Sequence, residues 1–353
     1  MQNSIWLYRL YDIAEEIKLD IVEKILAQNK PTSRMRLARI RPKSMQFKNP
    51  PVTVELDGGK VELPQGSFST VVTAKIYDLG VVSIVQRILL TPGTGYEDTK
   101  ALAVYLYNTE SLEATFARQL QLIRNILAPA IVKESYQGFT EDFTIYYFRD
   151  WQENWDPVPL LLAEPDPVSA QVRRETLQNS FSYSPGDLTI ITWDSALVYD
   201  TTGSTDIPDL LEFAVSQLLE LRYYDSLLTE EMEKMYAAIE EAETRFRRLN
   251  HYRQIMNQLM ELVVDISEIT ERIQNSLKVT EDIFYARVYG GALSIFRTKE
   301  WMDNIQHKIS VIQRSYSMLS DEIITRRSMW LEVAIVFLFV LEIVLGFLPV
   351  FHK

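Results

Sequence analysis

Alternating apolar and polar positions dominate the first two hundred residues and predict short β-strands. One strand is expected at Ile5–Tyr11. Two hairpins are expected where Asp57-Gly58-Gly59 and Asp78-Leu79-Gly80 interrupt runs of β-forming residues. Further strands are predicted at residues 143–148, 188–193 and 196–199. This part of the chain is therefore expected to contain a sheet.

Helical periodicity occurs twice within the same part. Asp12 and Glu15 form a capping-box pattern, and apolar residues then recur every four positions, at Ile13, Ile17, Ile21 and Ile25. A second apolar face is expected over residues 110–127. Strands and helices do not alternate regularly, so residues 1–205 are predicted to form an α+β domain rather than a doubly wound sheet.

The pattern becomes helical from Pro208 onward. A heptad-like seam starts at Leu228 and continues to Ile266, and a second apolar stripe runs from Trp301 to Ile323. Between them, Asp282–Phe296 predicts a shorter helix and a turn. We expect residues 206–328 to form a long antiparallel helical hairpin resembling a coiled coil.

The last apolar run, Met329–Phe351, predicts a C-terminal transmembrane helix. As a helix it would measure roughly 34 Å, against a hydrocarbon core of about 30 Å. Arg326 and Arg327 precede it, and this basic flank places the larger part of the chain on the cytoplasmic side. The expectation is a tail-anchored protein of a prokaryotic inner membrane, with membrane lipids among its partners.

Two glutamates interrupt that run, at Glu332 and Glu342. A carboxylate deep in a bilayer costs roughly 2.5 kcal/mol or more on insertion scales, so such residues usually face a partner. Glu332 lies close enough to one end to reach Arg327. Glu342 lies deeper and is expected to be protonated, to hydrogen-bond another copy of the chain, or to pack inside a protein core.

Composition limits the remaining alternatives. The net charge is -12 over 353 residues, which argues against a general nucleic-acid coat. The chain has no cysteine, which excludes disulfides and thiolate metal ligands. The N-terminal residues match neither a secretion signal nor a transit peptide.

Motifs for catalysis are not found. The three histidines, His251, His307 and His352, are far apart in sequence, so no metal site is predicted. Gly93-Thr94-Gly95 resembles a fragment of a dinucleotide loop, but it follows Pro92 and is not expected to open a helix, so a plain loop is favoured. No catalytic residue and no cofactor are predicted.

One basic segment stands out against the acidic background. No acidic residue lies between Glu23 and Glu55. The candidate contacts for an anionic partner in this segment are Lys30, Arg34, Arg36, Arg39, Arg41 and Lys43. A solvated loop is the simplest interpretation; lipid headgroups or a protein partner come second, and nucleic acid comes last because only Phe47 is available for stacking.

Several segments resemble the bacterial branch of the required-for-meiotic-nuclear-division family. They are Tyr183–Leu188, Leu211–Ala214 and Gln217–Asp225. The ten-residue spacing of Glu332 and Glu342 is similar to the end of family members, with Val333 in place of the usual Trp, and Leu79 replaces an aromatic residue. The resemblance implies large homo-oligomers anchored to a membrane and supplies no catalytic residue.

Three functions remain open. The favoured one is a non-catalytic, membrane-anchored scaffold that forms homo-oligomers and presents its α+β domain to an unknown protein partner. The alternatives are an RNA- or ribosome-tethering factor acting through the basic segment, and a ligand sensor or enzyme with a hidden pocket in the α+β domain.

Overall fold

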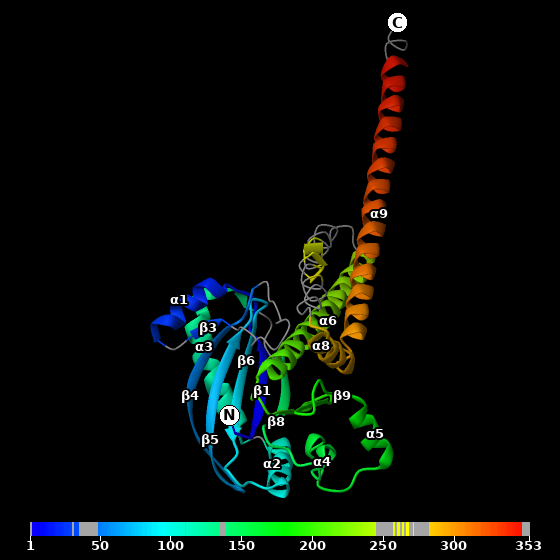
Figure 1. The fold of residues 1–353 in the computed structure, drawn as a ribbon. Helices are drawn as coiled ribbons and strands as arrows, with labels where there is room; N and C mark the ends of the chain where they lie inside the picture. The colour runs from blue at the N-terminus through cyan, green and yellow to red at the C-terminus, as the bar shows by residue number, and fades with distance from the viewer. Residues whose placement is uncertain are drawn as a thin grey trace. The chain divides into compact units, whose positions relative to one another are not determined.

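The computed structural model describes residues 2–29, 32–34, 49–109, 111–134, 139–244 and 282–347, with scattered positions between 257 and 271. Figure 1 shows its elements. The strands are β1 Ser4–Asp12, β2 Ala14–Ile17, β3 Thr32–Arg34, β4 Val52–Leu63, β5 Gly66–Ile76, β6 Val81–Leu89, β7 Ile131–Glu134, β8 Thr140–Phe148, β9 Ser180–Phe181, β10 Asp187–Ile191 and β11 Ser195–Asp200. The helices are α1 Leu19–Asn29, α2 Tyr96–Asn108, α3 Glu113–Leu127, the short 3-10 helix η1 Ala128–Ala130, α4 Pro157–Leu161, α5 Ala170–Gln178, α6 Asp206–Thr244, α8 Ile283–Ile295 and α9 Thr298–Phe347.

The chain divides into two compact units. Unit 1 contains residues Met1–Asp225 and Ile269–Met302, and unit 2 contains Ser226–Glu268 and Asp303–Lys353. Helices α6 and α9 each pass from one unit into the other. The predicted division at residue 205 falls just before α6 begins.

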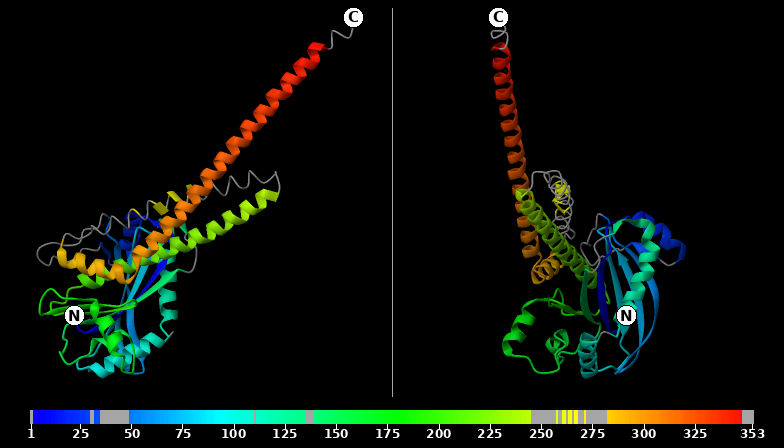
Figure 2. Two further views of the ribbon diagram at one scale, coloured as in Figure 1. Left: turned by 90° about the vertical axis from the view of Figure 1, so that its right-hand side faces the viewer. Right: turned by 180° about the vertical axis from the view of Figure 1, so that it is seen from behind.

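Unit 1 is built on a nine-stranded sheet within the described residues, in the order β3-β4-β5-β6-β1-β8-β11-β10-β9. Neighbouring strands are antiparallel except for β8 and β11, which are parallel. Helices α1, α2, α3 and α4 contribute to the core on one face, while α6 and α8 form the core on the other. Figure 2 shows the sheet between these two groups. The α+β class predicted for this region is confirmed.

Local expectations are partly confirmed. The strand at Ile5–Tyr11 is β1, the helix at 110–127 is α3, and the shorter helix at 282–296 is α8. The hairpin around Asp78-Leu79-Gly80 joins β5 to β6, with Gly80 at φ 98°. No side chain can be accommodated at residue 80, because a Cβ there would lie 1.6 Å from the Ala14 carbonyl oxygen.

Two local predictions are wrong. Asp57-Gly58-Gly59 is not a turn: β4 runs through it with an irregular register, and a Cβ on Gly58 would lie 2.3 Å from the Thr70 carbonyl oxygen of β5. This glycine therefore permits a close strand approach. The helix expected from Asp12 starts only at Leu19, because Ala14–Ile17 pairs with β7 as a strand.

The described part of unit 2 is helical, and the predicted apolar seam is buried there. Side chains from both predicted stripes are almost fully inaccessible: Leu228, Met235, Val263, Ile266, Ile305 and Ile312. The Lys308 ammonium also donates to the Thr229 hydroxyl at 2.6 Å. These contacts join α6 and α9 within the unit.

The predicted transmembrane helix is corrected by the structure. Within the part of the chain that is described, no helix combines the length and the apolar composition that a membrane span needs. The tail anchor and the inner-membrane localisation predicted from this segment are therefore not supported.

Candidate functional site

The site residues chosen from the sequence do not form one site in the described structure. Glu332 and Glu342 are exposed on α9. Arg326 and Arg327 belong to the same helix, but their side chains lie outside what is described. In the basic segment, Arg34 ends β3 without a described side chain, and the other five residues, Lys30, Arg36, Arg39, Arg41 and Lys43, lie outside the described residues.

A different group of charges is buried in unit 1, between the sheet and α6. The Lys75 ammonium, on β5, donates to the Asp209 carboxylate and to Oε2 of Glu212 at 2.6 Å. The exposed fractions of these three residues are only 5%, 9% and 1%. Asp209 and Glu212 lie three positions apart on α6, so both carboxylates project from one face of the helix toward the same strand. We call these three residues the buried charge centre.

The pKa values at the buried charge centre show the balance between burial and pairing. Burial lowers the pKa of Lys75, but the neighbouring carboxylates outweigh it and the net shift is upward. Burial raises the pKa of Glu212, and Asp209 adds to this shift, whereas Lys75 and the Ser83 hydroxyl oppose it without reversing it. One ammonium therefore does not fully compensate two carboxylates.

Aromatic residues enclose the buried charge centre. Tyr77 stacks on Phe213 with ring centroids 6.1 Å apart, and Phe213 stacks on Tyr289 at the same distance. The Tyr289 hydroxyl donates to Oε1 of Gln217 at 2.5 Å. In the described structure, the Tyr77 hydroxyl and Oε1 of Glu212 are buried without a hydrogen-bond partner. Such groups are uncommon in folded proteins and call for an explanation.

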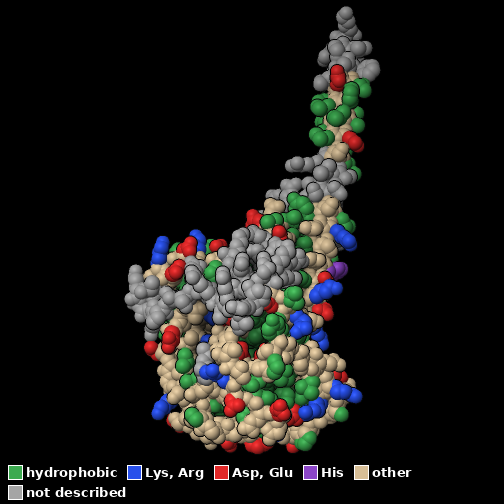
Figure 3. Space-filling view, in the orientation of Figure 1, with side chains coloured by type: hydrophobic (Ala, Val, Ile, Leu, Met, Phe, Trp, Pro, Cys, Tyr) green, Lys and Arg blue, Asp and Glu red, His purple; other side chains and the backbone are tan. Residues whose placement is uncertain are grey.

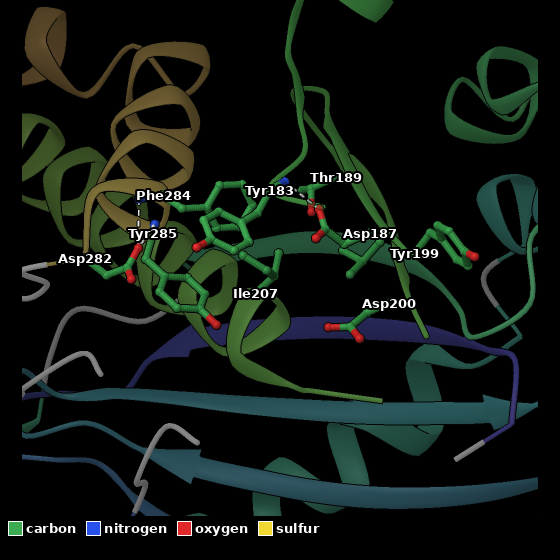
Figure 4. A pocket seen from close by; sticks show the side chains of 10 residues that line it. Tyr183, Asp187, Thr189, Tyr199, Asp200, Ile207, Asp282, Phe284 and Tyr285 are labelled. Carbon is green, nitrogen blue, oxygen red and sulfur yellow. Dashed lines mark hydrogen bonds between the residues drawn. The ribbon is translucent and has the colours of Figure 1, made fainter. Parts of the chain in front are cut away.

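A pocket lies in the same unit, among the loop after β9, strands β10 and β11, and the first turns of α6 and α8 (Figure 4). It has a cavity volume of about 60 Å³, enough for a few water molecules. Its lining residues are Tyr183, Asp187, Thr189, Val198, Tyr199, Asp200, Ile207, Asp282, Phe284 and Tyr285.

The acidic side chains of the pocket are fixed by local hydrogen bonds. Asp187 accepts from the backbone N–H groups of Tyr183 and Ser184 at 2.7 and 2.8 Å. Asp200 accepts from the backbone N–H of Thr202 at 2.7 Å. Asp282 caps α8 by accepting from the backbone N–H groups of its first turn. The pocket thus combines fixed negative charge with aromatic walls, a combination that suits a cationic group.

One hydrogen bond joins the pocket to α6. The Tyr285 hydroxyl donates to Oδ2 of Asp206 at 2.9 Å. Burial and Asp206 both raise the pKa of Tyr285, so this phenol stays protonated and acts as a donor near neutral pH. Asp206 lies three positions before Asp209, so the pocket and the buried charge centre use successive turns of one helix face.

The sequence predicts neither a metal site nor a dinucleotide-binding loop, and the structure describes part of the residues concerned. Among the described residues, no group of three or more His, Asp or Glu is arranged to hold a metal ion. The Gly93-Thr94-Gly95 segment does open a helix, because α2 begins at Tyr96, contrary to expectation. Its first turn carries Glu97 and Asp98, which would repel a phosphate at that helix terminus.

Sequence reasoning missed the buried charge centre because its members are far apart in sequence. Lys75 and Glu212 are separated by 137 positions. One signal was available: α6 is buried continuously from Asp206 to Leu221, and acidic residues recur within this apolar stretch at three-residue spacing. Carboxylates on the buried face of a helix require a partner.

Comparison with known proteins identifies a family. The family model described as "Uncharacterized protein MJ0711, N-terminal domain" matches residues 2–205, and the chain belongs to this family. "Uncharacterized protein MJ0711" of Methanocaldococcus jannaschii is 26% identical over 219 residues, which cover 59% of this chain and 66% of the archaeal protein. The match thus spans just under two-thirds of that relative. No solved structure matches. These findings support a family of unknown function, and they do not support the meiotic-division name or the bacterial branch expected from the sequence.

Proposed function

We propose that the protein is a non-catalytic scaffold that associates with further copies of itself through the end of α9. One observation carries this proposal. Ten large apolar side chains between Leu331 and Ile343 are exposed, seven of them in consecutive positions from Ile335 to Leu341, with exposed fractions between 43% for Leu341 and 65% for Phe337. Figure 3 shows hydrophobic side chains on this part of the helix. We call this segment the apolar end of α9.

The apolar end surrounds the helix rather than forming a single stripe. Glu332 and Glu342 are ten positions apart, which places them about 80° apart around the helix axis. The remaining arc is apolar. A helix that is apolar on most of its circumference is normally buried. A single partner helix would leave much of this arc in water, so a bundle of several copies covers it better, with the glutamates on the outer side.

The energetics favour a partner that covers the whole segment. Fully burying one large aliphatic or aromatic side chain contributes roughly 1.5–3 kcal/mol, so covering the exposed half contributes about 1 kcal/mol per residue. The ten exposed large apolar residues from Leu331 to Ile343 then supply about 10 kcal/mol per chain. Association costs an estimated 4–15 kcal/mol, so the full apolar end is needed to offset it.

The test is the mass of the full-length protein in solution across a range of concentrations, measured by sedimentation velocity. We expect an oligomer that dissociates on dilution, and weaker assembly when Val336 and Val340 are both changed to Asn. A matched control changes Gln306 and Gln313, two exposed polar residues of α9, to Asn. A protein that stays monomeric throughout, or a Val336→Asn/Val340→Asn variant that assembles like wild type, contradicts the proposal. Flotation with neutral phospholipid vesicles that needs Val336 and Val340 would assign the surface to lipid instead.

The pocket supports a second candidate function, the sensing of a small cationic ligand. Its three aspartates accept hydrogen bonds from backbone and hydroxyl groups, and the Tyr183 ring next to them is 68% exposed. Methylammonium is a suitable probe, because it is small enough for a cavity of about 60 Å³. We expect it to shift the NMR signals of pocket residues, and we expect Tyr183→Ala to weaken this shift. Equal shifts in the variant would exclude the pocket as the binding site.

We also propose that the chain is related to the required-for-meiotic-nuclear-division family. The segment Gln217–Asp225 and the spacing of Glu332 and Glu342 support it. The first of these lies in a largely buried part of α6, where Gln217 accepts a hydrogen bond from Tyr289 and Arg222 pairs with Glu141. Because that family forms large homo-oligomers, the sedimentation experiment bears on this proposal as well.

A further inference from the structure

The buried charge centre contains unequal numbers of positive and negative groups. Lys75 is the cation, and Asp209 and Glu212 are the anions, all more than nine-tenths buried. With all three ionised, the buried charge centre would carry one uncompensated negative charge. Such a charge is costly in a medium of low dielectric constant, and proteins usually neutralise it by binding a proton.

Among the described residues that shift the pKa of Glu212, Lys75 is the single cation. The charged groups that act on its carboxyl are Lys75 and Asp209. The groups that face the buried charge centre from the packed elements are Tyr8 of β1, Tyr77 after β5, Ser83 of β6 and Tyr289 of α8, with the Arg87 guanidinium acting on Tyr8. The Arg87 guanidinium carbon lies 3.9 Å from the centre of the Trp6 ring, over its face.

The two carboxylates differ in what they can accept. Asp209 is held by Lys75 on one oxygen and by the Thr205 hydroxyl at 3.3 Å on the other. Glu212 uses Oε2 for Lys75, and its Oε1 has no partner within hydrogen-bonding geometry in the described structure. The neutral hydroxyl of Ser83 acts on this carboxyl and is itself buried without a hydrogen-bond partner by the same geometry. Glu212 is therefore both the less exposed of the two carboxylates and the one whose second oxygen is available to bind a proton.

We propose that the buried charge centre is a proton-binding site, in which Oε1 of Glu212 carries the proton while Lys75 and Asp209 form the ion pair. The proton makes the contact between α6 and β5 electrically neutral. Because α6 continues from unit 1 into unit 2, the site makes the attachment of this connecting helix dependent on pH.

The sign of the pH dependence follows from linkage. Burial raises the pKa of Glu212 in the folded protein above the value of about 4.3 expected in the unfolded chain. The stabilisation is therefore complete below about pH 4.3 and is lost as the pH rises through the folded pKa. Within this window the unfolding equilibrium constant increases by up to tenfold per pH unit. Lys75 contributes no slope here, because its upward-shifted pKa lies above 10.5.

Other carboxyls titrate in the same direction, so the experiment must separate them. Burial also raises the pKa of Glu141, which pairs with Arg222, and that of Asp194. Glu212→Gln mimics the protonated side chain and removes one titrating group. Glu141→Gln is the matched control, because it removes another buried carboxyl from the same unit.

The measurement is chemical unfolding of the full-length protein at about pH 5 and about pH 8. We expect wild type to lose more stability at the higher pH than Glu212→Gln, and Glu141→Gln to lose more than Glu141→Gln/Glu212→Gln. Each difference should approach tenfold in the unfolding constant for each pH unit crossed below the folded pKa of Glu212. An unchanged pH dependence in Glu212→Gln overturns the proposal. So does a wild-type stability at about pH 8 that rises with Na⁺ or K⁺ but not with equal choline, since a metal cation would then replace the proton.

A second measurement does not need the Glu212 variant to fold. The protein carrying Glu141→Gln is labelled with ¹³C-glutamate and its infrared spectrum is recorded as the pH is raised. A protonated glutamic acid gives a carbonyl band that moves with the label, and we expect one such band to persist after the bands of the other glutamates have disappeared. If no labelled band persists in this way, the proposal is also overturned.

Discussion

Removing the ammonium from the buried charge centre should destabilise unit 1 strongly. In Lys75→Met the aliphatic stem is kept, but Asp209 and Glu212 lose the donor that both share. Breaking a buried ion pair by deleting one partner costs about 3–5 kcal/mol, because the remaining charge stays buried and uncompensated. A typical domain is stable by only 5–15 kcal/mol, so this change should remove a large part of the stability of unit 1.

The loss of stability in Lys75→Met has one contribution from charge and one from packing, and a double variant separates the two. In Lys75→Met/Glu212→Gln one of the two carboxyl groups that have lost their donor is also replaced by an amide, which does not ionise, so we expect a smaller loss than in Lys75→Met alone. Residues in direct contact are expected to show an interaction energy of about 0.5–3 kcal/mol in such a cycle. Lys100→Met is the matched control: its ammonium donates to the Pro165 carbonyl oxygen at 2.9 Å in an exposed position, and its loss should cost less than about 1 kcal/mol.

The assay is urea unfolding of the full-length protein, followed by tryptophan fluorescence. Trp6 is 1% exposed on β1, which makes it a reporter for unit 1. Because the chain has two units, the transition should be fitted only where a second probe, such as circular dichroism, coincides with it. The reasoning is refuted if Lys75→Met unfolds within about 1 kcal/mol of wild type, or if the double variant is no more stable than Lys75→Met.

Three further predictions concern backbone geometry and surface charge. Gly80→Ala should lower the stability by at least about 3 kcal/mol, because it combines φ 98° with a Cβ placed 1.6 Å from a carbonyl oxygen; a thermal melt within a few degrees of wild type would contradict this. Gly291→Ala should cost less, about 1–2 kcal/mol, because the Cβ meets only the end of the Phe181 ring, which can turn; Phe181→Leu should relieve the loss in the same melt. Arg9→Ala should cost less than about 1 kcal/mol, because its partner Glu113 is 47% exposed, and high salt should abolish the difference from wild type.

The elements that were predicted correctly are those whose signals lie within a few neighbouring residues. The strand at Ile5–Tyr11 and the turn at Asp78-Leu79-Gly80 were predictable, because alternation and turn chemistry are local properties. The segment after Asp12 was not. Its capping-box pattern favours a helix, but Ala14–Ile17 finds strand partners in β7, more than a hundred residues away. Hydrogen bonds from a distant strand outweighed the local preference.

The candidate site shows the same limit more sharply. Glu332 and Glu342 were conspicuous in the sequence because they interrupt an apolar run, yet both are exposed in the structure. Lys75 looked like an ordinary strand residue, and only the packing of α6 on β5 brings Asp209 and Glu212 to it. When a charged residue is far from its partner in sequence, the residues next to it do not indicate that it will be buried.

The sequence by itself determined the α+β class of the first domain, the apolar seams of α6 and α9, and the apolar end of α9, because each depends on the periodicity of neighbouring residues. Tertiary structure alone decided the strand order, the bulge at Gly58, the pocket beside α8 and the buried charge centre. These depend on which distant segments meet, and a meeting of this kind is set by the summed burial of many apolar side chains, not by any short pattern.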